Sequence, residues 1–182
     1  MPALDYPSHL VEDWQLSDGT PVRIRPIRAD DLALHTAFVA DLSNETGYRR
    51  LLSPRKPQPD ELRHMTDIDY HHELALIATT EVDGNELQLG VVRYVRGETP
   101  ETVDIAEFAV VIADAWQHHG IAARLMHKLI DAARQAGVKQ LADITLYDNL
   151  GMLGLARKLG FRVQRDPGNA NVTRLNLDLP AR

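Results

Sequence analysis

Hydrophobic and polar positions recur along the chain with the periods of strands and helices, most clearly between residues 104 and 136. Residues 105–112 form an apolar, partly β-branched run that contains one charge, Glu107, and this run predicts a buried strand. Alternation would place its side chains on two faces, Ala106, Phe108, Val110 and Ile112 on one, and Glu107, Ala109 and Val111 on the other.

An amphipathic helix is predicted after this strand and a short loop. Its apolar residues share one stripe, formed by Ile121, Leu125, Leu129, Ala132, Ala133 and Ala136. Gly137 follows, a residue that tolerates the left-handed conformation common at helix C-termini. The loop at residues 117–122 therefore precedes a helix N-terminus, where free N–H groups and the helix dipole favour an anion, most often a phosphate.

Weaker patterns predict the other elements. Asp18-Gly19 lies between two apolar runs, at 11–16 and 22–27, and predicts a β-hairpin. Asp30 and Asp60 are expected to open helices that end near Leu42 and Met65, whereas the proline-rich stretch 43–59 is expected to be irregular. Further strands are predicted at residues 73–80, 87–96, 141–147, 161–163 and 172–179, and a helix at 150–159.

The predicted order of elements, ββααβββαβαββ, indicates a mixed α/β fold built in layers. A chain of 182 residues is long enough for one stable core, and it contains no repeat or linker. We therefore expect a single domain over residues 1–182, with residues 1–10 as a loose or partner-docked arm.

Composition excludes several classes of protein. The chain has no cysteine, no run of about 18 apolar residues and no signal sequence, so we expect a cytoplasmic protein without a membrane span, a disulfide or a cysteine–acyl intermediate. A net charge of -6 argues against a nucleic-acid partner. The histidine pairs at residues 71–72 and 118–119 lack the spacing of zinc ligands, so no metal is expected.

Several motifs together resemble a known family. Gln117-x-x-Gly120-x-Ala122 after an apolar strand, with Asn149 after the next strand, resembles the acetyl-CoA loop of the GNAT superfamily of N-acyltransferases. The segments 18–27, 68–70, 106–110 and 152–161 resemble the acetyltransferase domain of bacterial Pat-type protein lysine acetyltransferases, over about residues 10 to 180. The resemblance implies an acyl-CoA N-acyltransferase fold with a mostly antiparallel central sheet flanked by helices, and acetyl-CoA as the acetyl donor.

Glu107 is the candidate for catalysis. A lysine ammonium has a pKa of about 10.4, so forming the free amine at pH 7 costs about 4.6 kcal/mol. A carboxylate that is partly buried in an apolar strand has a raised pKa and is suited to accept that proton. On the residues alone, Glu107 is equally consistent with a charge on a solvated face. The resemblance implies that it is the general base.

The resemblance also implies contacts with acetyl-CoA from Val110, Ile112, Gln117, His118, His119, Gly120, Ile121, Ala122 and Asn149. Asn149 also fits a helix N-cap, and the two roles are compatible. Relatives often carry glycine where this chain has His118 and Ala122, and a basic residue where it has His119. Because His119 is mostly neutral at pH 7, N–H groups are expected to dominate the pyrophosphate contacts.

No general acid can be assigned from the sequence. Many GNAT enzymes carry a tyrosine seven residues after the asparagine, where this chain has Ala156. CoA can leave as a thiolate without that acid, and Tyr147 is the alternative proton donor. Tyr48 and Tyr70 fall in segments expected on the acceptor side, although packing explains them more simply.

The expected activity is acetyl transfer to a primary amine by direct attack in a ternary complex, with a protein lysine as the acceptor that the resemblance implies. A small amine, such as a polyamine, an amino acid or an antibiotic, is the first alternative. A module that senses acetyl-CoA without turnover is the second. The sequence leaves the choice between a monomer and a homodimer open.

Overall fold

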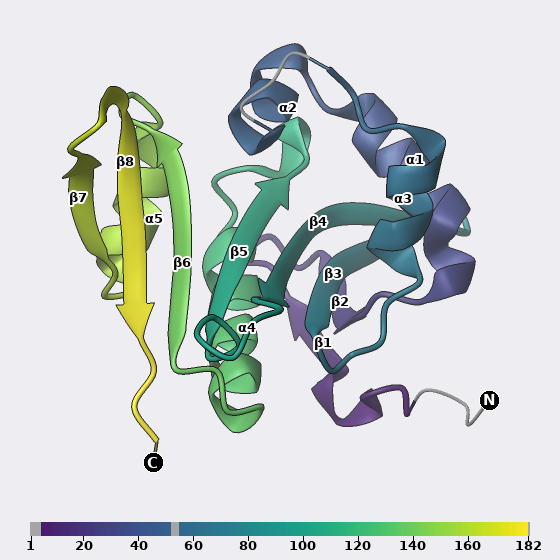
Figure 1. Cartoon of the computed structure of the whole chain (residues 1–182). Coiled ribbons are helices and arrows are strands. Elements are labelled where there is room, and N and C mark those ends of the chain that lie inside the picture. Colours follow the sequence, from purple (N-terminus) through teal and green to yellow (C-terminus); the bar gives the residue numbers. More distant parts are fainter. Residues whose placement is uncertain (1–4, 52–54, 182) are drawn as a thin grey trace.

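A mixed sheet of eight strands forms the centre of the molecule (Figure 1). The structure is a computed structural model that describes residues 5–51 and 55–181, without the side chains of residues 48–51. The strand order is β1-β2-β3-β4-β5-β6-β8-β7, and β5 and β6 are the only neighbours in this sheet that run parallel. The expected mixed α/β fold with a mostly antiparallel sheet is confirmed.

The strands of this sheet are β1 (Glu12–Gln15), β2 (Pro21–Pro26), β3 (Glu73–Val82), β4 (Asn85–Arg96), β5 (Ile105–Ile112), β6 (Gln140–Leu146), β7 (Arg162–Asp166) and β8 (Asn169–Asp178). The α-helices of the described residues are α1 (Leu32–Asp41), α2 (Asn44–Leu51), α3 (Pro59–Thr66), α4 (Ile121–Gln135) and α5 (Leu150–Lys158). Short 3-10 helices are η1 (Ser8–Leu10), η2 (Ala29–Asp31) and η3 (Asp114–Trp116). No described helix is long and apolar enough to span a membrane.

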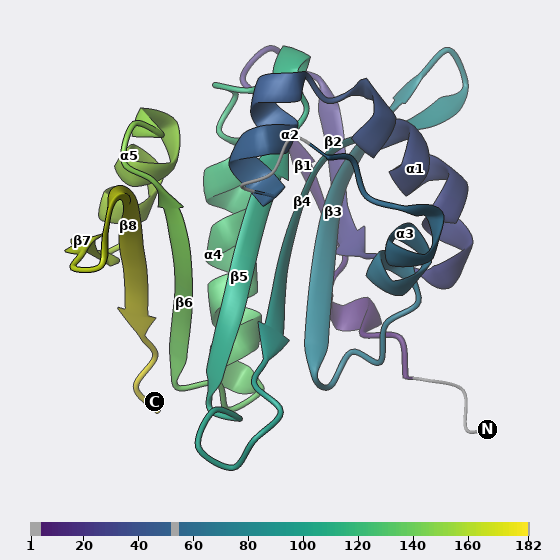
Figure 2. The same ribbon diagram turned by 45° about the horizontal axis from the view of Figure 1, so that its top comes forward.

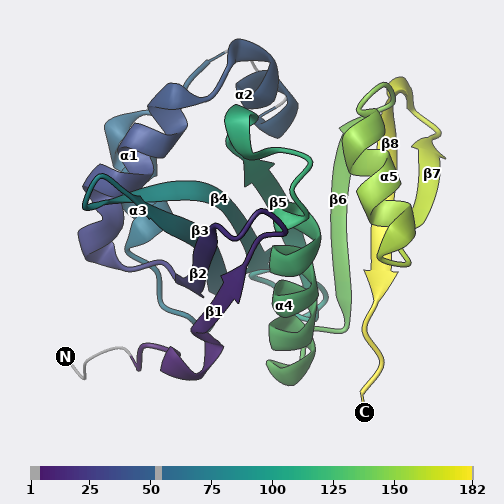
Figure 3. The same ribbon diagram turned by 180° about the vertical axis from the view of Figure 1, so that it is seen from behind.

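Helices cover both faces of the sheet, with α1, α2 and α3 on one side and α4 and α5 on the other (Figures 1 and 3). Because successive side chains of β5 point to opposite faces, the strand packs against the helices on both sides of the sheet, as predicted. Phe108 packs in the larger core cluster with Leu125 of α4, and Val111 packs in the smaller cluster with Phe38 of α1. Glu107 shares the face of Val111, so it lies on the side of the sheet that carries α1 and α3.

The sheet divides into two parts, or wings, between β5 and β6. One wing contains β1 to β5, and the other contains β6, β8 and β7. The two strands pair only over Ile105–Glu107 and Gln140–Ala142. Beyond that point β5 stays paired with β4 as far as Ile112, and β6 stays paired with β8 as far as Leu146. Figure 2 shows the two ribbons diverging toward the end of the sheet that carries α2 and α5.

The structure corrects two expectations about the α1–α2 region. Residues 44–51 form α2, where the sequence predicts an irregular segment, because the prolines begin only at residue 54 and Ser43 supplies a helix start. The Ser43 hydroxyl accepts a hydrogen bond from the Thr46 N–H at 3.2 Å. In addition, α1 begins after Asp31 rather than Asp30, because both carboxylate oxygens of Asp31 bind the Arg25 guanidinium at 2.7 Å.

The helix α4 agrees with its predicted stripe except at the C-terminal end. Ile121, Leu125 and Leu129 are buried, and the buried face also includes Met126 and Ile130. Ala136 is exposed, because the helix ends at Gln135 and the chain turns away. Gly137 has the left-handed conformation that its position predicts, with φ +81°.

The N-terminal segment packs against the sheet where it is described. The Tyr6 hydroxyl donates a hydrogen bond to the Pro26 carbonyl at 3.0 Å, and its ring meets the Tyr70 ring edge to face. The hairpin of β1 and β2 turns at Gly19, whose φ is +90°, as Asp18-Gly19 predicts. Residues 5–10 are therefore in contact with the domain, and residues 1–4 lie outside the described part.

Candidate active site

A large groove opens where β5 and β6 separate. It has a volume of about 730 Å³ and is open to solvent. Residues 109–112 of β5 form one wall, residues 143–145 of β6 form the other, and the start of α4 closes one end. Glu45 and Thr46 of α2 and Lys158 of α5 lie on its rim. The groove is thus built from both wings of the sheet.

The groove walls offer free backbone groups. On the side that faces the groove, residues 109–112 of β5 and 143–145 of β6 have no strand partner, because the β5–β6 ladder ends at Glu107 and Ala142. Backbone N–H and C=O groups favour hydrogen bonds, and a ligand that carries amide groups can complete such an edge. The walls therefore fit an extended, amide-containing chain between the two strands.

The loop at the head of α4 is shaped for an anion. Gly120 has φ +81° and directly precedes Ile121, the first residue of the helix. His118 also has a positive φ, +65°, although it is not glycine. The first N–H groups of a helix lack intrahelical acceptors and lie at the positive end of its dipole. Phosphate groups fit this position, as the sequence predicts.

Two side chains hold this loop in place. Gln117 Nε2 donates to the Ile112 carbonyl at 3.2 Å, which fastens the loop to the end of β5. The Asp114 carboxylate accepts hydrogen bonds from the Ser43 N–H at 2.9 Å and from the Ser43 and Thr46 hydroxyls at 2.7 Å. Burial raises the pKa of Asp114, but these hydrogen bonds outweigh burial and hold it below its usual value. Asp114 thereby connects the loop to α2.

Most of the predicted contact residues come together at the groove. Those that line it are Val110, Ile112, Gln117, His118, Gly120, Ile121, Ala122 and Asn149. His119 does not line it, because its Nδ1 atom lies 2.8 Å from the Gln117 carbonyl and its ring turns toward Trp116. The sequence did not identify Asp114 or Thr46, whose contacts join segments far apart in the chain.

Asn149 has the N-cap role that its position predicts. Its Oδ1 atom accepts a hydrogen bond from the Met152 N–H at 3.3 Å, at the start of α5. Its Nδ2 atom donates to the Thr145 hydroxyl at 3.1 Å, which ties α5 to β6. Asn149 thus fixes one wall of the groove while lining it.

Glu107 does not line the groove but lies two residues before Ala109, at the point where the β5–β6 ladder stops. Its register partners are Val95 on β4 and Ala142 on β6. The side chain is exposed, so the expected partial burial is wrong. Glu107 is the third residue of β5 and lies beyond the helices that cover Val111 on the same face. An exposed carboxylate here is accessible to an incoming acceptor.

Ala156 and the tyrosines whose side chains are described do not line the groove. Ala156 is 1% exposed and packs in the core, and Tyr147 is 52% exposed at the end of β6. The Tyr70 hydroxyl donates to the Ile27 carbonyl at 2.7 Å, which confirms its packing role, and burial raises its pKa to about 12. Tyr48 lies outside the described side chains. None of the described residues that line the groove is a tyrosine.

A second, mostly apolar pocket of about 60 Å³ lies under α1 and α3. Phe38, Leu42 and Met65 line it together with Val91, and Val111 belongs to both this pocket and the groove. The pocket therefore lies on the face of the sheet that also carries Glu107. No three potential metal ligands gather anywhere in the part of the chain that the structure describes.

A sheet that parts between two parallel strands, with an anion-binding loop at the head of the following helix, is the architecture of an acyltransferase that uses CoA thioesters. Comparison with known proteins agrees with this class. The sequence model described as "Acetyltransferase (GNAT) family" matches residues 38–161, and the chain belongs to this family. It is therefore an acetyltransferase, and acetyl-CoA is the donor typical of the family.

Relatives support the predicted subfamily. Acetyltransferase PA5475 of Pseudomonas aeruginosa is 36% identical over 167 residues, which cover 89% of this chain and 85% of the relative. Acetyltransferase Pat of Mycolicibacterium smegmatis is 30% identical over 146 residues, which cover 80% of this chain but 43% of Pat.

Solved structures show the same fold. The GNAT domain of S. lividans Pat superposes with a TM-score of 0.85 at 30% identity, covering 96% of this chain and 100% of that domain. YncA, an acetyltransferase of Salmonella typhimurium solved with acetyl-CoA, has a TM-score of 0.70 at 19% identity, covering 88% of this chain and 95% of YncA. The predicted family, the likeness to the Pat GNAT domain and the fold are confirmed.

Proposed function

We propose that this acetyltransferase moves an acetyl group from acetyl-CoA to the side-chain amine of a lysine in another protein. The observation that carries the proposal is the exposure of Glu107 on an open face of the sheet, two residues before Ala109, where the groove wall begins. A shallow, open site suits a lysine presented by a protein surface, whereas a polyamine would favour a deep acidic cavity. The likeness to the GNAT domain of Pat supports the same acceptor class.

Acetyl-CoA would lie along the groove. Its phosphates would bind the N–H groups at Gly120 and Ile121, and its pantetheine amides would complete the free edges of β5 and β6. Lys158 lies on the rim and would contribute a cation toward the phosphates. This placement brings the thioester to the inner end of the groove, near Ala109 and Glu107.

The chemistry then follows from proton transfer. The acceptor ammonium loses a proton to the Glu107 carboxylate, directly or through a water, at a cost of about 4.6 kcal/mol at pH 7 for an unperturbed lysine. The free amine attacks the thioester carbon, the new C–N bond forms, and the C–S bond breaks. CoA leaves as a thiolate, in keeping with a described groove lining that contains no tyrosine. The proton that remains on the product nitrogen passes to solvent.

The first test of the proposal is the substitution Glu107→Gln, which keeps the size of the side chain and removes the proton acceptor. We expect the rate of acetylation at pH 7 to fall by about 100-fold or more, with the affinity for acetyl-CoA unchanged by calorimetry. Glu101→Gln, in the β4–β5 loop, serves as the control. Turnover within a few-fold of the unsubstituted protein would place the base elsewhere.

Substrate class is decided separately with isotopically labelled acetyl-CoA and a cell lysate, followed by mass spectrometry of the acetylated proteins. Label on lysine side chains of proteins is the expected result. Label confined to small molecules would refute a protein acceptor and leave the assignment of Glu107 intact.

A small primary amine is the second candidate acceptor, and the apolar pocket beside Val111 favours it. That pocket could hold a small apolar group of an amino acid while its amine reaches Glu107. Comparing kcat/KM for a lysine peptide with kcat/KM for free amino acids and polyamines distinguishes the two acceptors.

A further inference from the structure

We infer that Glu73 is a second acidic residue of the acceptor site, and that it holds the ammonium group of the acceptor together with Glu107. This inference rests on the proposed transfer to a primary amine and assigns a residue that binds the cation before its proton is removed. Nothing in the sequence pattern singles out Glu73, which is the first residue of β3.

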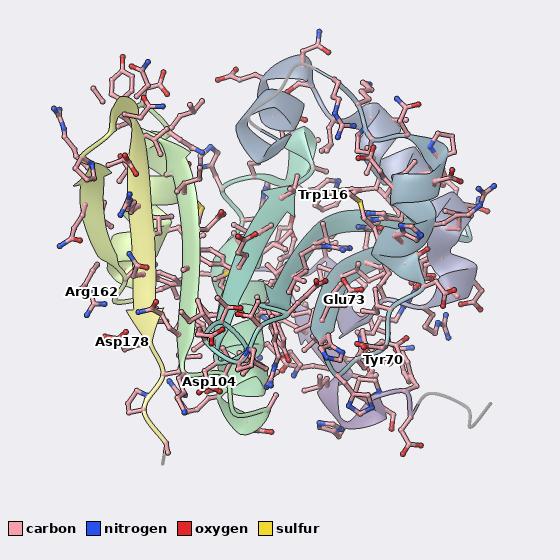
Figure 4. All side chains as sticks on the ribbon, viewed as in Figure 1. Tyr70, Glu73, Asp104, Trp116, Arg162 and Asp178 are labelled. Atoms are coloured by element: carbon pink, nitrogen blue, oxygen red, sulfur yellow. The ribbon has the colours of Figure 1, made fainter. Side chains whose placement is uncertain are left out.

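The sheet register places the two carboxylates in one row. Glu73 on β3 is opposite Val95 on β4, and Val95 is opposite Glu107 on β5. Residues directly opposite each other share a face, so both glutamates lie on the same side, about 10 Å apart at Cα across two strand spacings. Figure 4 labels Glu73 on the side of the sheet that carries α1 and α3.

The space between the two glutamates has an apolar floor. Val95 is 42% exposed between them, so no described side chain covers it completely. An extended lysine side chain can lie against this valine while its ammonium group meets a carboxylate on either side. Two carboxylates on either side of an exposed valine match the chemistry of a long aliphatic amine.

The Glu73 carboxylate is partly buried and still has room for hydrogen-bond donors. Its side chain is 27% exposed, and its nearest cation is Arg93, with Nη1 at 3.9 Å. The Arg93 Nη2 atom donates instead to the Met65 carbonyl at 2.7 Å. Among the described residues no donor forms a hydrogen bond with the Glu73 carboxylate. A carboxylate accepts several hydrogen bonds, and an acceptor ammonium would supply donors to this one.

The charges around Glu73 agree with this role. Burial raises the pKa of Glu73, and Asp69 raises it further, whereas Arg93, His64 and His72 lower it without reversing the shift. An added cation would therefore stabilise the ionised form of Glu73. The position of the residue is fixed locally, because Asp69 Oδ1 accepts hydrogen bonds from the N–H groups of His71 and His72 at 2.8 Å.

If Glu73 binds the acceptor, its removal should change the acceptor KM and kcat in a defined way. Contact with a second carboxylate stabilises the ammonium form of the acceptor, so it strengthens binding but does not help the proton to leave. Removing that contact should raise the acceptor KM without lowering kcat. Removing the base Glu107 should instead lower kcat, so the two glutamates are distinguishable.

The experiment compares Glu73→Gln with Glu107→Gln and with the control Glu81→Gln, which changes an exposed residue near the other end of β3. With a lysine peptide, Glu73→Gln is expected to raise the acceptor KM about tenfold, leave the acetyl-CoA KM unchanged and leave kcat equal or higher. An unchanged acceptor KM overturns the inference. So does a parallel change in both KM values with a lower melting temperature, which would mark Glu73 as only a structural partner of Arg93.

A binding measurement separates this inference from the proposed function. The carboxyl carbons of glutamates in the full chain are followed by NMR while the methylamide of Nα-acetyl-lysine is added at pH 7. Shifts at both Glu73 and Glu107 are expected in the original protein, and the shift at Glu107 should be much smaller in Glu73→Gln, even if proteins prove not to be the acceptors. No shift at Glu73 overturns the inference, whatever acceptor the enzyme uses.

Discussion

At the scale of single residues, the loop that we propose to bind the phosphates has an unusual backbone conformation. His118 has φ +65° and Gly120 has φ +81°, two left-handed residues within three positions. Left-handed backbone is unfavourable for residues with a Cβ atom and most unfavourable for β-branched ones. This makes His118 a strained residue at the proposed phosphate site.

The strain at His118 predicts contrasting effects of two substitutions. His118→Val should lower the free energy of unfolding by about 1–2 kcal/mol, because a β-branched residue does not tolerate this φ. His118→Gly should leave it within about 1 kcal/mol of the original, since relief of strain offsets the greater freedom of glycine in the unfolded chain. Urea denaturation measures both, and equal effects of the two substitutions would contradict the argument.

The substitution His118→Gly also tests whether the His118 imidazole contributes to acetyl-CoA binding. If backbone N–H groups dominate the phosphate contacts, the affinity of His118→Gly for acetyl-CoA should stay within a few-fold of that of the original protein. A much larger loss in calorimetry would show that the His118 side chain binds the donor.

At the scale of elements, the loop before α4 and the helix α2 behave as one unit. Asp114 follows β5 and accepts three hydrogen bonds from Ser43 and Thr46, at the start of α2. Thr46 also lies on the rim of the groove, beside the loop that Gln117 fastens to Ile112. Donor binding on this loop would therefore restrain α2, on the side where the acceptor would enter.

Removing this connection should loosen α2 and weaken donor binding together. Asp114→Ala loses hydrogen bonds to a carboxylate, each worth about 1.5–3 kcal/mol at most, and should reduce acetyl-CoA affinity several-fold. Hydrogen–deuterium exchange should become faster in α2 while α4 stays protected. Asp114→Asn keeps one acceptor oxygen and should retain part of both properties. Unchanged exchange in α2 would show that the contact does not stabilise that helix.

At the scale of the whole molecule, a buried ion pair, Asp69 and a half-buried tyrosine set the pH range of stability. Arg25 and Asp31 are almost fully buried and form two contacts of 2.7 Å. Burial raises the pKa of Asp31, but Arg25 outweighs burial and holds it below the usual value. The pKa of Asp69 is lowered to about 2, because hydrogen bonds from His71 and His72 overcome its burial, and the pKa of Tyr70 is raised to about 12.

These pKa shifts predict that the free energy of unfolding declines at both acidic and alkaline pH. Carboxyls whose pKa is lowered on folding contribute stability above about pH 3.9, and that stability is lost as the pH falls toward about 2. A tyrosine whose pKa is raised contributes stability below about pH 10, and that stability is lost as the pH rises toward about 12. Urea denaturation across this range should show both declines. In Tyr70→Phe the alkaline decline should be smaller.

Asp31→Asn tests the acidic decline directly. It leaves the Arg25 charge buried without its main partner, so the free energy of unfolding at pH 7 should fall by about 3–5 kcal/mol. Glu86, which also contacts Arg25 at 3.1 Å and is more exposed, provides the control in Glu86→Gln, with a loss of about 1 kcal/mol or less. Similar losses in both variants would show that burial of the pair is not the decisive factor.

Local patterns in the sequence were sufficient for much of this molecule. The period of residues 105–112 and 121–135, the glycines at 19 and 137, and the asparagine at 149 each act through neighbouring residues, and the structure confirms all of them. The family resemblance rested on the same local motifs. Such features can be read from the chain because their hydrogen bonds and apolar contacts join residues a few positions apart.

Only the tertiary structure decided how the site is put together. The parting of β5 from β6, the exposure of Glu107 and the contacts of Asp114 with α2 depend on which distant segments become neighbours. The same holds for the row from Glu73 through Val95 to Glu107, which exists because β3, β4 and β5 pair in one register. A residue's burial and charged neighbours follow from that pairing, and the period of its own segment does not specify them.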